Sequence, residues 1–393
     1  MNIIRSYISL HLKVISLIFI FSILFSKRSS AQQNVSSLQL YNYQFDHLTF
    51  ENGLSFNLVT SIIKDKQGFI WIATIDGLNR YDGVSFKIYR HDAHNLNSLA
   101  GNSIYAMTLD AKGNIWMATD AALTEYIPAT DSFKNFFVTT VSKNRSTRSL
   151  YVDSHNVVWF GDNDGLCRLN ADGKIETFPI RHLYQRFSIG SIIEDDEGVI
   201  WVGTIQGLYS FDKQTHIFKR YLFDPGMKNE NAVMCIIQDH EKNIWAGTWG
   251  GGVAKFDPHT GKFELYKYAG IRSNIVWSIY ESADQPGKLW VGTADRGAAI
   301  FDKNKKSFEF VSIDPGNIYA FNSSAVSHIF DDHLGTLWFA SHNGVIKLIS
   351  TNSNSRDRPL SLLQKLAIKA LPELLLTRNL LTNHYGFQLT GTD

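Results

Sequence analysis

Short apolar runs alternate with turn residues along most of the chain, in a phrase that returns at nearly even intervals. Residues 194–212 read EDDEGVIWVGTIQGLYSFD, and similar phrases read KDKQGFIWIATIDGLNRYD at residues 64–82 and QDHEKNIWAGTWGGGVAKFD at residues 238–257. Short apolar runs bounded by glycine, asparagine and aspartate predict brief β-strands joined by tight turns. The pattern therefore predicts a repeated all-β unit.

Tryptophan marks the same position in every copy of the phrase. The spacings between successive copies are 45, 43, 42, 44, 45 and 48 residues, and the positions are Trp71, Trp116, Trp159, Trp201, Trp245, Trp290 and Trp338. An aspartate precedes each tryptophan by six residues: Asp65, Asp110, Asp153, Asp195, Asp239, Asp284 and Asp332. Aspartate followed three residues later by glycine or asparagine is hairpin-turn chemistry, in which the carboxylate caps backbone N–H groups. We expect the tryptophan to fill the space between neighbouring sheets.

Four predicted strands per copy, at this spacing, are typical of a β-propeller blade. The seven copies predict a seven-bladed β-propeller of four-stranded antiparallel blades over residues 43–350. The seventh copy, residues 327–350, ends after its third strand, whereas residues 43–50 (YQFDHLTF) precede the first blade and have no blade of their own. We expect this N-terminal strand to complete the seventh blade, because closing the ring removes open sheet edges.

The two ends of the chain have a different composition. Residues 1–31 combine basic residues, an apolar run from Val14 to Phe25 and small residues up to Ala31, which predicts a signal peptide, with an uncleaved membrane anchor as the alternative. Residues 351–393 lack the repeat and are expected to be a helical or disordered tail, either an amphipathic helix or the product of a truncated or frameshifted gene. The N-terminal segment predicts export to the periplasm.

Charge and cysteine content narrow the function classes. The chain has 38 basic and 37 acidic residues, a balance that argues against a dedicated nucleic-acid binder. Cys167 and Cys235 have no metal-ligand spacing and are expected to be buried free thiols, with a disulfide left open. The histidines form no close pairs, so no metal and no cofactor are expected. The acidic stretch at residues 194–198 lacks the ligand pattern of a calcium loop and is expected to be a solvated turn.

The whole set of repeats resembles the two-component regulator propeller family, whose unit reads D-x-x-G-x-[IL]-W-[IV]-[GA]-T-x-x-G-L. The resemblance covers residues 45–350. It implies the periplasmic, glycan-sensing half of a hybrid histidine-kinase sensor of the kind found in Bacteroidetes, here without the kinase. The expected partners are an oligosaccharide or other small polar ligand, a second copy of the chain, or a kinase-bearing chain.

Candidate ligand-binding residues lie where the repeat departs from itself, on the face expected to carry the loops that follow the tryptophan strands. Five residues before the turn aspartate, allowing for an insertion in blade six, the copies read Thr60, Tyr105, Arg148, Gly190, Met234, Trp277 and Ser327. The large side chains here and their neighbours give the candidate set: Tyr105, Arg148, Asn102, Asn231, Trp249, Arg272, Asn274, Trp277, Arg296 and His342. Aromatic faces with arginine and asparagine donors suit a sugar. Alternatively, Trp249 and Trp277 plug the central channel.

Three functions remain open at this point. The first is a non-catalytic sensor, in which the repeated aspartates are turn caps because a catalytic group is needed once and not seven times. The second is a propeller lyase, acting on a polysaccharide or a small cyclic ester, which would need a base such as His342 near Asp295 or Arg296. The third is a binding or scaffolding propeller without a signalling role. No catalytic residue is expected under the first and third.

Overall fold

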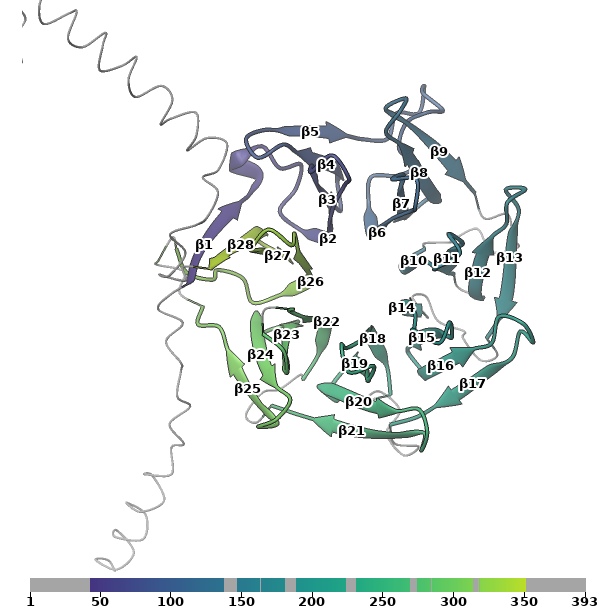
Figure 1. Ribbon diagram of the computed structural model, residues 1–393. Helices are drawn as coiled ribbons and strands as arrows, with labels where there is room; N and C mark the ends of the chain where they lie inside the picture. The colour runs from purple at the N-terminus through teal and green to yellow at the C-terminus, as the bar shows by residue number, and fades with distance from the viewer. Residues whose placement is uncertain are drawn as a thin grey trace, which may run out of the picture. The chain divides into compact units, whose positions relative to one another are not determined.

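The computed structural model describes residues 43–137, 147–162, 164–180, 189–223, 231–268, 274–283, 285–313, 317 and 319–350. The predicted signal peptide, Arg272, Asp284 and the predicted tail after Ser350 lie outside these ranges. Within them the strands form seven four-stranded antiparallel sheets, arranged as the blades of a ring (Figure 1). The predicted seven-bladed propeller is confirmed.

Each blade is one sheet whose strands follow the chain outward from the centre of the ring, except that blade 7 takes its outermost strand from the N-terminal end of the described chain. The blades are, in order: blade 1, β2 (Val59–Lys64), β3 (Ile70–Thr74), β4 (Gly77–Tyr81) and β5 (Phe86–Tyr89); blade 2, β6 (Ile104–Leu109), β7 (Ile115–Thr119), β8 (Leu123–Ile127) and β9 (Ser132–Phe136); blade 3, β10 (Leu150–Val152), β11 (Val158–Gly161), β12 (Gly165–Leu169) and β13 (Ile175–Pro179); blade 4, β14 (Ile189–Glu194), β15 (Ile200–Thr204), β16 (Gly207–Phe211) and β17 (Phe218–Tyr221); blade 5, β18 (Val233–Gln238), β19 (Ile244–Thr248), β20 (Val253–Asp257) and β21 (Lys262–Tyr266); blade 6, β22 (Val276–Glu281), β23 (Lys288–Thr293), β24 (Ala298–Asp302) and β25 (Ser307–Phe310); blade 7, β26 (Val326–Asp331), β27 (Thr336–Ser341), β28 (Gly344–Ser350) and β1 (Tyr43–Leu48).

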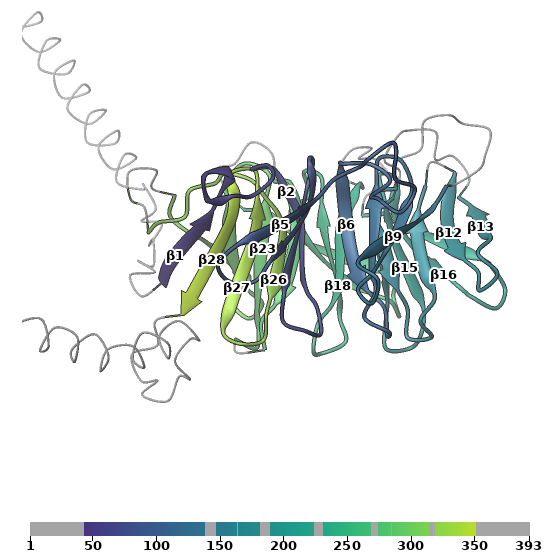
Figure 2. The same ribbon diagram turned by 90° about the horizontal axis from the view of Figure 1, so that it is seen from above.

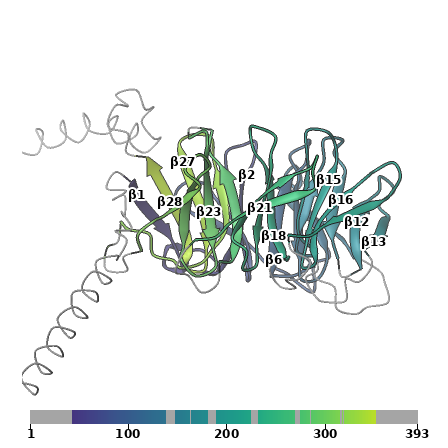
Figure 3. The same cartoon turned by 90° about the horizontal axis from the view of Figure 1, so that it is seen from below.

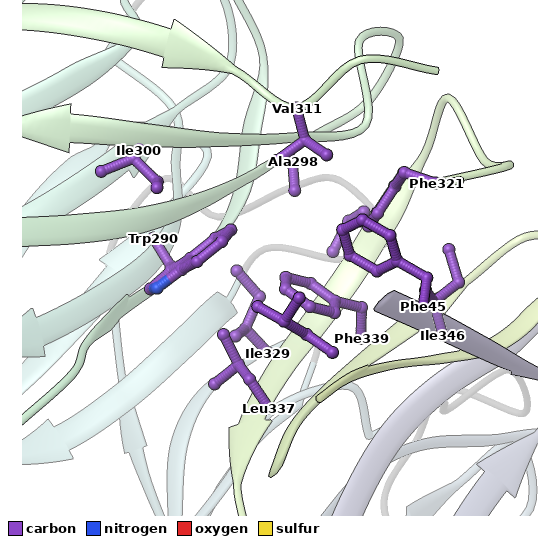
Figure 4. Close-up of a cluster of buried hydrophobic side chains, with 12 residues drawn as sticks. Phe45, Trp290, Ala298, Ile300, Val311, Phe321, Ile329, Leu337, Phe339 and Ile346 are labelled. Atoms are coloured by element: carbon purple, nitrogen blue, oxygen red, sulfur yellow. The ribbon is translucent and has the colours of Figure 1, made fainter. Parts of the chain in front are cut away.

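The ring closes through β1, as the sequence predicts. β1 pairs antiparallel with β28, in a register that runs from Tyr43 opposite Ser350 to Leu48 opposite Val345. Phe45 anchors the strand by packing edge-on against Phe321, with ring centroids 5.5 Å apart. Both rings belong to the buried apolar cluster that joins blades 6 and 7 (Figure 4). The N-terminal strand therefore covers the edge that β28 would otherwise expose.

The repeated aspartate and tryptophan form one structural unit. In six blades the indole Nε1–H donates to the Oδ2 of the aspartate six residues earlier, over 2.6 to 3.3 Å. The other carboxylate oxygen accepts two backbone N–H groups of the turn, as in Asp65, where the donors are Gln67 and Phe69 at 2.9 Å. The turn residue three before the tryptophan has positive φ even where it is not glycine, as in Asn156 and Lys242. The predicted turn cap is confirmed, and the bond to the indole is an additional role.

The inner strands leave one sheet edge facing the centre of the ring, and side chains of neighbouring blades supply some of its hydrogen bonds. Ser191 of blade 4 accepts the N–H of Ile236 in blade 5 at 3.2 Å, and His328 Nδ1 of blade 7 accepts the N–H of Ile62 in blade 1 at the same distance. Neither Cys167 nor Cys235 forms a disulfide, as expected, and Cys167 is buried whereas Cys235 is half-buried. In the described part of the chain, no helix has the length and apolar character needed to cross a bilayer.

Candidate functional site

Backbone contacts sort the connections between strands into two faces, seen from the side in Figures 2 and 3. We call the loop face the one that carries the loops from second to third strands and from each blade to the next. On it, Gly77 N–H donates to the Asn102 carbonyl at 2.8 Å, and Asp120 N–H donates to the Ser103 carbonyl at 3.0 Å. The turn face carries the aspartate turns and the turns from third to fourth strands. These two kinds of turn meet in neighbouring blades, as where Lys303, after β24, contacts Asp239, after β18. This arrangement agrees with the one expected from the sequence.

The variable position of the repeat is a β-bulge at the loop-face end of the inner strand. In six blades the register between the first and second strands shifts at this residue: Thr60, Tyr105, Gly190, Met234, Trp277 and Ser327. Arg148 occupies the corresponding place in blade 3, two residues before β10. A bulged residue is unpaired in the ladder, and its side chain is re-aimed. This explains physically why the position escapes the packing that keeps its neighbours uniform.

Bulge residues contact the next blade around the ring. The guanidinium carbon of Arg148 lies 4.3 Å from the centroid of the Tyr105 ring, a cation–π contact between blades 3 and 2. Thr60 Oγ1 donates to the Ile104 carbonyl at 2.6 Å. Gly190 is confined, because a Cβ there would lie 2.8 Å from the Val233 carbonyl oxygen. The bulges thus combine a role at the blade seams with a place on the loop face.

A second group of candidates gathers on blades 5 to 7. The rings of Trp277 and His342 are in contact with centroids 5.2 Å apart and planes tilted by 41°, and burial lowers the pKa of the His342 imidazole. Trp249 lies in the loop after β19, where its backbone bridges to Ile275 and its side chain stays 46% exposed. β22 and β26 lie across the ring from β6 and β10, so this group and the Tyr105–Arg148 pair occupy opposite sides (Figure 1).

The three candidate asparagines share one structural bond. The side-chain Oδ1 atoms of Asn102, Asn231 and Asn274 accept the backbone N–H groups of His91, Phe223 and Tyr268, which follow the last strand of the preceding blade, over 2.8 to 3.0 Å. Asn57 makes the same bond to Phe50 at 2.7 Å. A bond repeated in four blades favours a structural role. The sequence carried this signal, because Asn57 precedes Trp71 by fourteen residues just as Asn102 precedes Trp116.

The remaining candidate and the acidic stretch are placed differently from the sequence expectation. The Arg296 guanidinium lies 5.0 Å from the Phe310 ring of β25, in the outermost strand of blade 6. Glu194, expected in a solvated turn, has a side chain only 5% exposed that pairs with Lys213. Desolvation alone would raise the pKa of Glu194, but its bonds to Lys213 and Ser154 outweigh this and lower it.

One described cluster has the composition of a metal site. Ligand atoms of Asp153, His155 and Glu194 lie within 4.8 Å of one another. The Lys213 ammonium contacts both carboxylates, at 3.5 Å from Asp153 Oδ2. A lysine side chain thus already supplies the positive charge that a metal ion would bring. The residues do not fit a metal site.

The chain shares segments with proteins of two-component signalling. The two component regulator propeller family matches residues 53–76, 98–121, 186–206 and 227–250. Over 59 residues the chain is 42% identical to Histidine kinase P4 of Formosa agariphila, a stretch that covers 15% of this chain and 4% of that protein.

Solved structures extend the similarity to the ring. The extracellular domain of a hybrid two-component system from B. thetaiotaomicron is 28% identical, with a TM-score of 0.66, over 78% of this chain and 42% of that one. The chain thus spans less than half the length of that extracellular domain. Virginiamycin B lyase from Staphylococcus aureus superimposes with a TM-score of 0.62 over 78% of this chain and 99% of the lyase. At 14% identity this second likeness shows a common fold alone.

Proposed function

Because this chain carries two-component regulator propeller repeats and is similar to the extracellular domain of a hybrid two-component system, we propose that it is an exported ligand-sensing propeller. Its ligand is an oligosaccharide that binds reversibly on the loop face and is left intact. Signal output then requires a kinase, either on a further segment or on a separate chain. The matched relative, which is much longer than this chain, is a histidine kinase. The proposed location is the periplasm.

One observation carries this proposal. The same β-bulge recurs at the loop-face end of the inner strands, with a different side chain in each blade, while the residue before it is a buried valine or isoleucine in all six of these blades. A structural position would follow the repeat. A ring of varied side chains near the centre of one face is instead suited to recognising a ligand of irregular shape, since binding sites combine apolar surface with a few placed polar groups.

The chemistry of the large bulge residues favours a sugar. Trp249 is 46% exposed in a loop of the loop face, and Trp277 is half-buried at the bulge of blade 6. Aromatic rings of this kind stack against the CH faces of sugars. Arg148, held over the Tyr105 ring, carries N–H donors that match hydroxyl acceptors. The two groups lie on opposite sides of the ring, so a ligand that contacts both must be longer than a monosaccharide.

The proposal is tested by isothermal titration of the full chain with a panel of plant and host oligosaccharides, followed by analysis of the recovered sugar. Trp277→Ala and Arg148→Ala should each weaken binding at least tenfold, while the melting temperatures of the free proteins stay close to wild type. His333→Ala is the control, because this exposed side chain lies on the turn face, and the variant should bind as wild type does.

Other outcomes separate the alternatives. A buried structural tryptophan cut to alanine would cost about 3–5 kcal/mol of unfolding free energy, so early melting of Trp277→Ala would assign the residue to stability. Cleaved or rearranged sugar in the wild-type mixture would favour a lyase. No binding by any oligosaccharide in the panel would overturn the glycan assignment.

A further inference from the structure

Two seams on the turn face are held by the same arrangement of a lysine and two carboxylates. Lys303 of blade 6 lies 3.0 Å from Asp239 Oδ2 of blade 5 and 2.7 Å from Glu281 Oε1 of its own blade. Lys213 of blade 4 contacts Asp153 of blade 3 and Glu194 of its own blade in the same way. Each lysine follows the last aromatic residue of the third strand by two positions. Two of the seven blades thus share a defined place for an ammonium group, which we call the lysine seat.

The lysine seat of blade 6 is a buried ion pair. The Lys303 side chain is only 8% exposed, and the Asp239 and Glu281 side chains are 0% and 5% exposed. Burial alone would lower the pKa of Lys303, but its bonds to Glu281 and Asp239 outweigh burial and raise it. The seat therefore favours a charged ammonium over a neutral amine.

Blade 5 lacks both of the residues that blades 4 and 6 contribute to this arrangement. Pro258 follows Phe256 at the position that holds Lys213 and Lys303 in blades 4 and 6, and Gln238 stands where those blades have Glu194 and Glu281. The turn aspartate of the preceding blade, Asp195, is retained, and its Oδ2 accepts the Trp201 indole N–H at 2.6 Å.

The seam between blades 4 and 5 is open at this place. A groove of about 870 Å³ is lined by Asp195, Gln238 and Pro258, the three counterparts of the residues that form the lysine seats. Tyr221 and Phe263, both half-buried, contribute aromatic walls. The groove residues include five carboxylates, Asp195, Glu197, Glu241, Asp257 and Glu264, against three lysines, Lys242, Lys255 and Lys262. Because Glu264 pairs with Lys306 and Glu241 lies 3.8 Å from Lys303, the groove has no net acidic excess. The correspondence of Asp195 with Asp153 and Asp239, and not the net charge, favours a cationic occupant.

We infer that this groove binds a primary ammonium on an alkyl stem, carried by another molecule. The bound group takes the place that Lys213 and Lys303 fill in the neighbouring seams, with its charge at Asp195 and its stem against the aromatic walls. The source is either a lysine side chain of a partner protein or a free alkylamine. This site lies on the turn face, so it is independent of the proposed sugar site on the loop face.

The test follows the Trp201 indole N–H by NMR in the full chain, because that proton is bonded to Asp195. The probes are Nα-acetyl-lysine methylamide and 1,5-diaminopentane, with the neutral Nε-acetylated lysine derivative at matched ionic strength as control. The charged probes should shift the resonance saturably, and the neutral derivative should not. Stronger binding of the lysine derivative than of the diamine indicates a protein partner, and the reverse indicates a free amine.

Two variants make the assignment decisive. Gln238→Glu adds the missing carboxylate and should tighten binding of the charged probes several-fold. Pro258→Lys combined with Gln238→Glu supplies the missing lysine from the chain itself, and should abolish binding while raising the melting temperature. Saturable binding that survives in the double variant would overturn the inference, as would equal shifts by neutral and charged probes. If the double variant does not fold, Gln238→Glu alone decides, because unchanged or weaker binding contradicts the inference.

Discussion

At the scale of single residues, the repeated aspartate matters because it satisfies the turn and the tryptophan at once. Trp71 is 1% exposed, and its indole N–H has Asp65 as acceptor at 2.7 Å. A buried donor left without an acceptor costs about 1–3 kcal/mol. This explains why six described blades keep the aspartate, although it takes no part in any reaction.

Asp65→Asn should lower the free energy of unfolding by about 1–3 kcal/mol. An asparagine can still accept the turn N–H groups through its oxygen, but its amide group then faces the indole N–H with a second donor. Combining the change with Trp71→Phe removes that donor, so the double variant should lose less than the sum of the two single changes. Chemical denaturation of all four proteins measures the coupling, and strict additivity would contradict the account.

His328 makes the seam that closes the ring sensitive to acid. Its Nδ1 must be unprotonated to accept the Ile62 N–H, and burial lowers the pKa of this imidazole from 6.5 to about 4. Because the unfolded chain then binds more protons than the folded one, the contribution is complete above about pH 6.5 and is lost as pH falls toward 4. His328→Ser, the residue type at the same place in Ser191, should therefore reduce the loss of stability between pH 7.5 and pH 4.5.

Denaturant titrations at the two pH values test this directly. His333→Ser, on an exposed turn of the same blade, serves as the control and should keep the wild-type pH dependence. An unchanged pH dependence in His328→Ser would show that the imidazole does not titrate with folding.

At the scale of elements, neighbouring blades are joined by side-chain bridges, and the ring is closed by the N-terminal strand β1. Lys303 illustrates the bridges, because removing one partner of a buried ion pair leaves an uncompensated charge. Lys303→Met should destabilise the chain by about 3–5 kcal/mol. Lys305→Met, at a side chain 77% exposed, should stay within about 0.5 kcal/mol of wild type. Equal melting temperatures for the two variants would show that the Lys303 bridge does not contribute to stability.

Deleting residues 43–50 tests closure by β1. Without this strand β28 has an open edge and the pocket around Phe321 loses Phe45, so the protein should melt much earlier and aggregate. A synthetic peptide of residues 43–52, added in excess, should restore much of the lost melting temperature. A deleted protein that is as stable and soluble as wild type would remove the closure scheme.

The sequence predicts the elements well because the repeat reports the same local rule many times. Asp65 and Gly68 define a turn, Trp71 defines the strand after it, and the blade count leaves residues 43–50 for closure. The site is harder to predict, because it depends on which side chains meet between blades. The contact of Arg148 with Tyr105 and the use of Asn102 as a loop anchor follow from the bulge and the ring, and neither is visible in one copy of the phrase.

At the scale of the whole molecule, the propeller separates two kinds of surface. The loop face carries the bulge residues that differ from blade to blade, whereas the turn face carries the lysine bridges of blades 4 and 6 and the groove at the seam of blades 4 and 5. A ligand on one face can influence an output only through its different affinity for two states of the protein. The proposed sugar site and the proposed ammonium site thus offer two separate inputs.

The most direct test of the central claim is hydrogen–deuterium exchange of the full chain, with and without the oligosaccharide identified by titration. The account predicts slower exchange at the loop-face ends of the inner strands, in peptides that contain Tyr105, Arg148 and Trp277, and in the loop that contains His342. Exchange in the aspartate turns should not change. Protection confined to the turn face, with unchanged exchange at the bulges, would contradict the claim that these residues form the binding site.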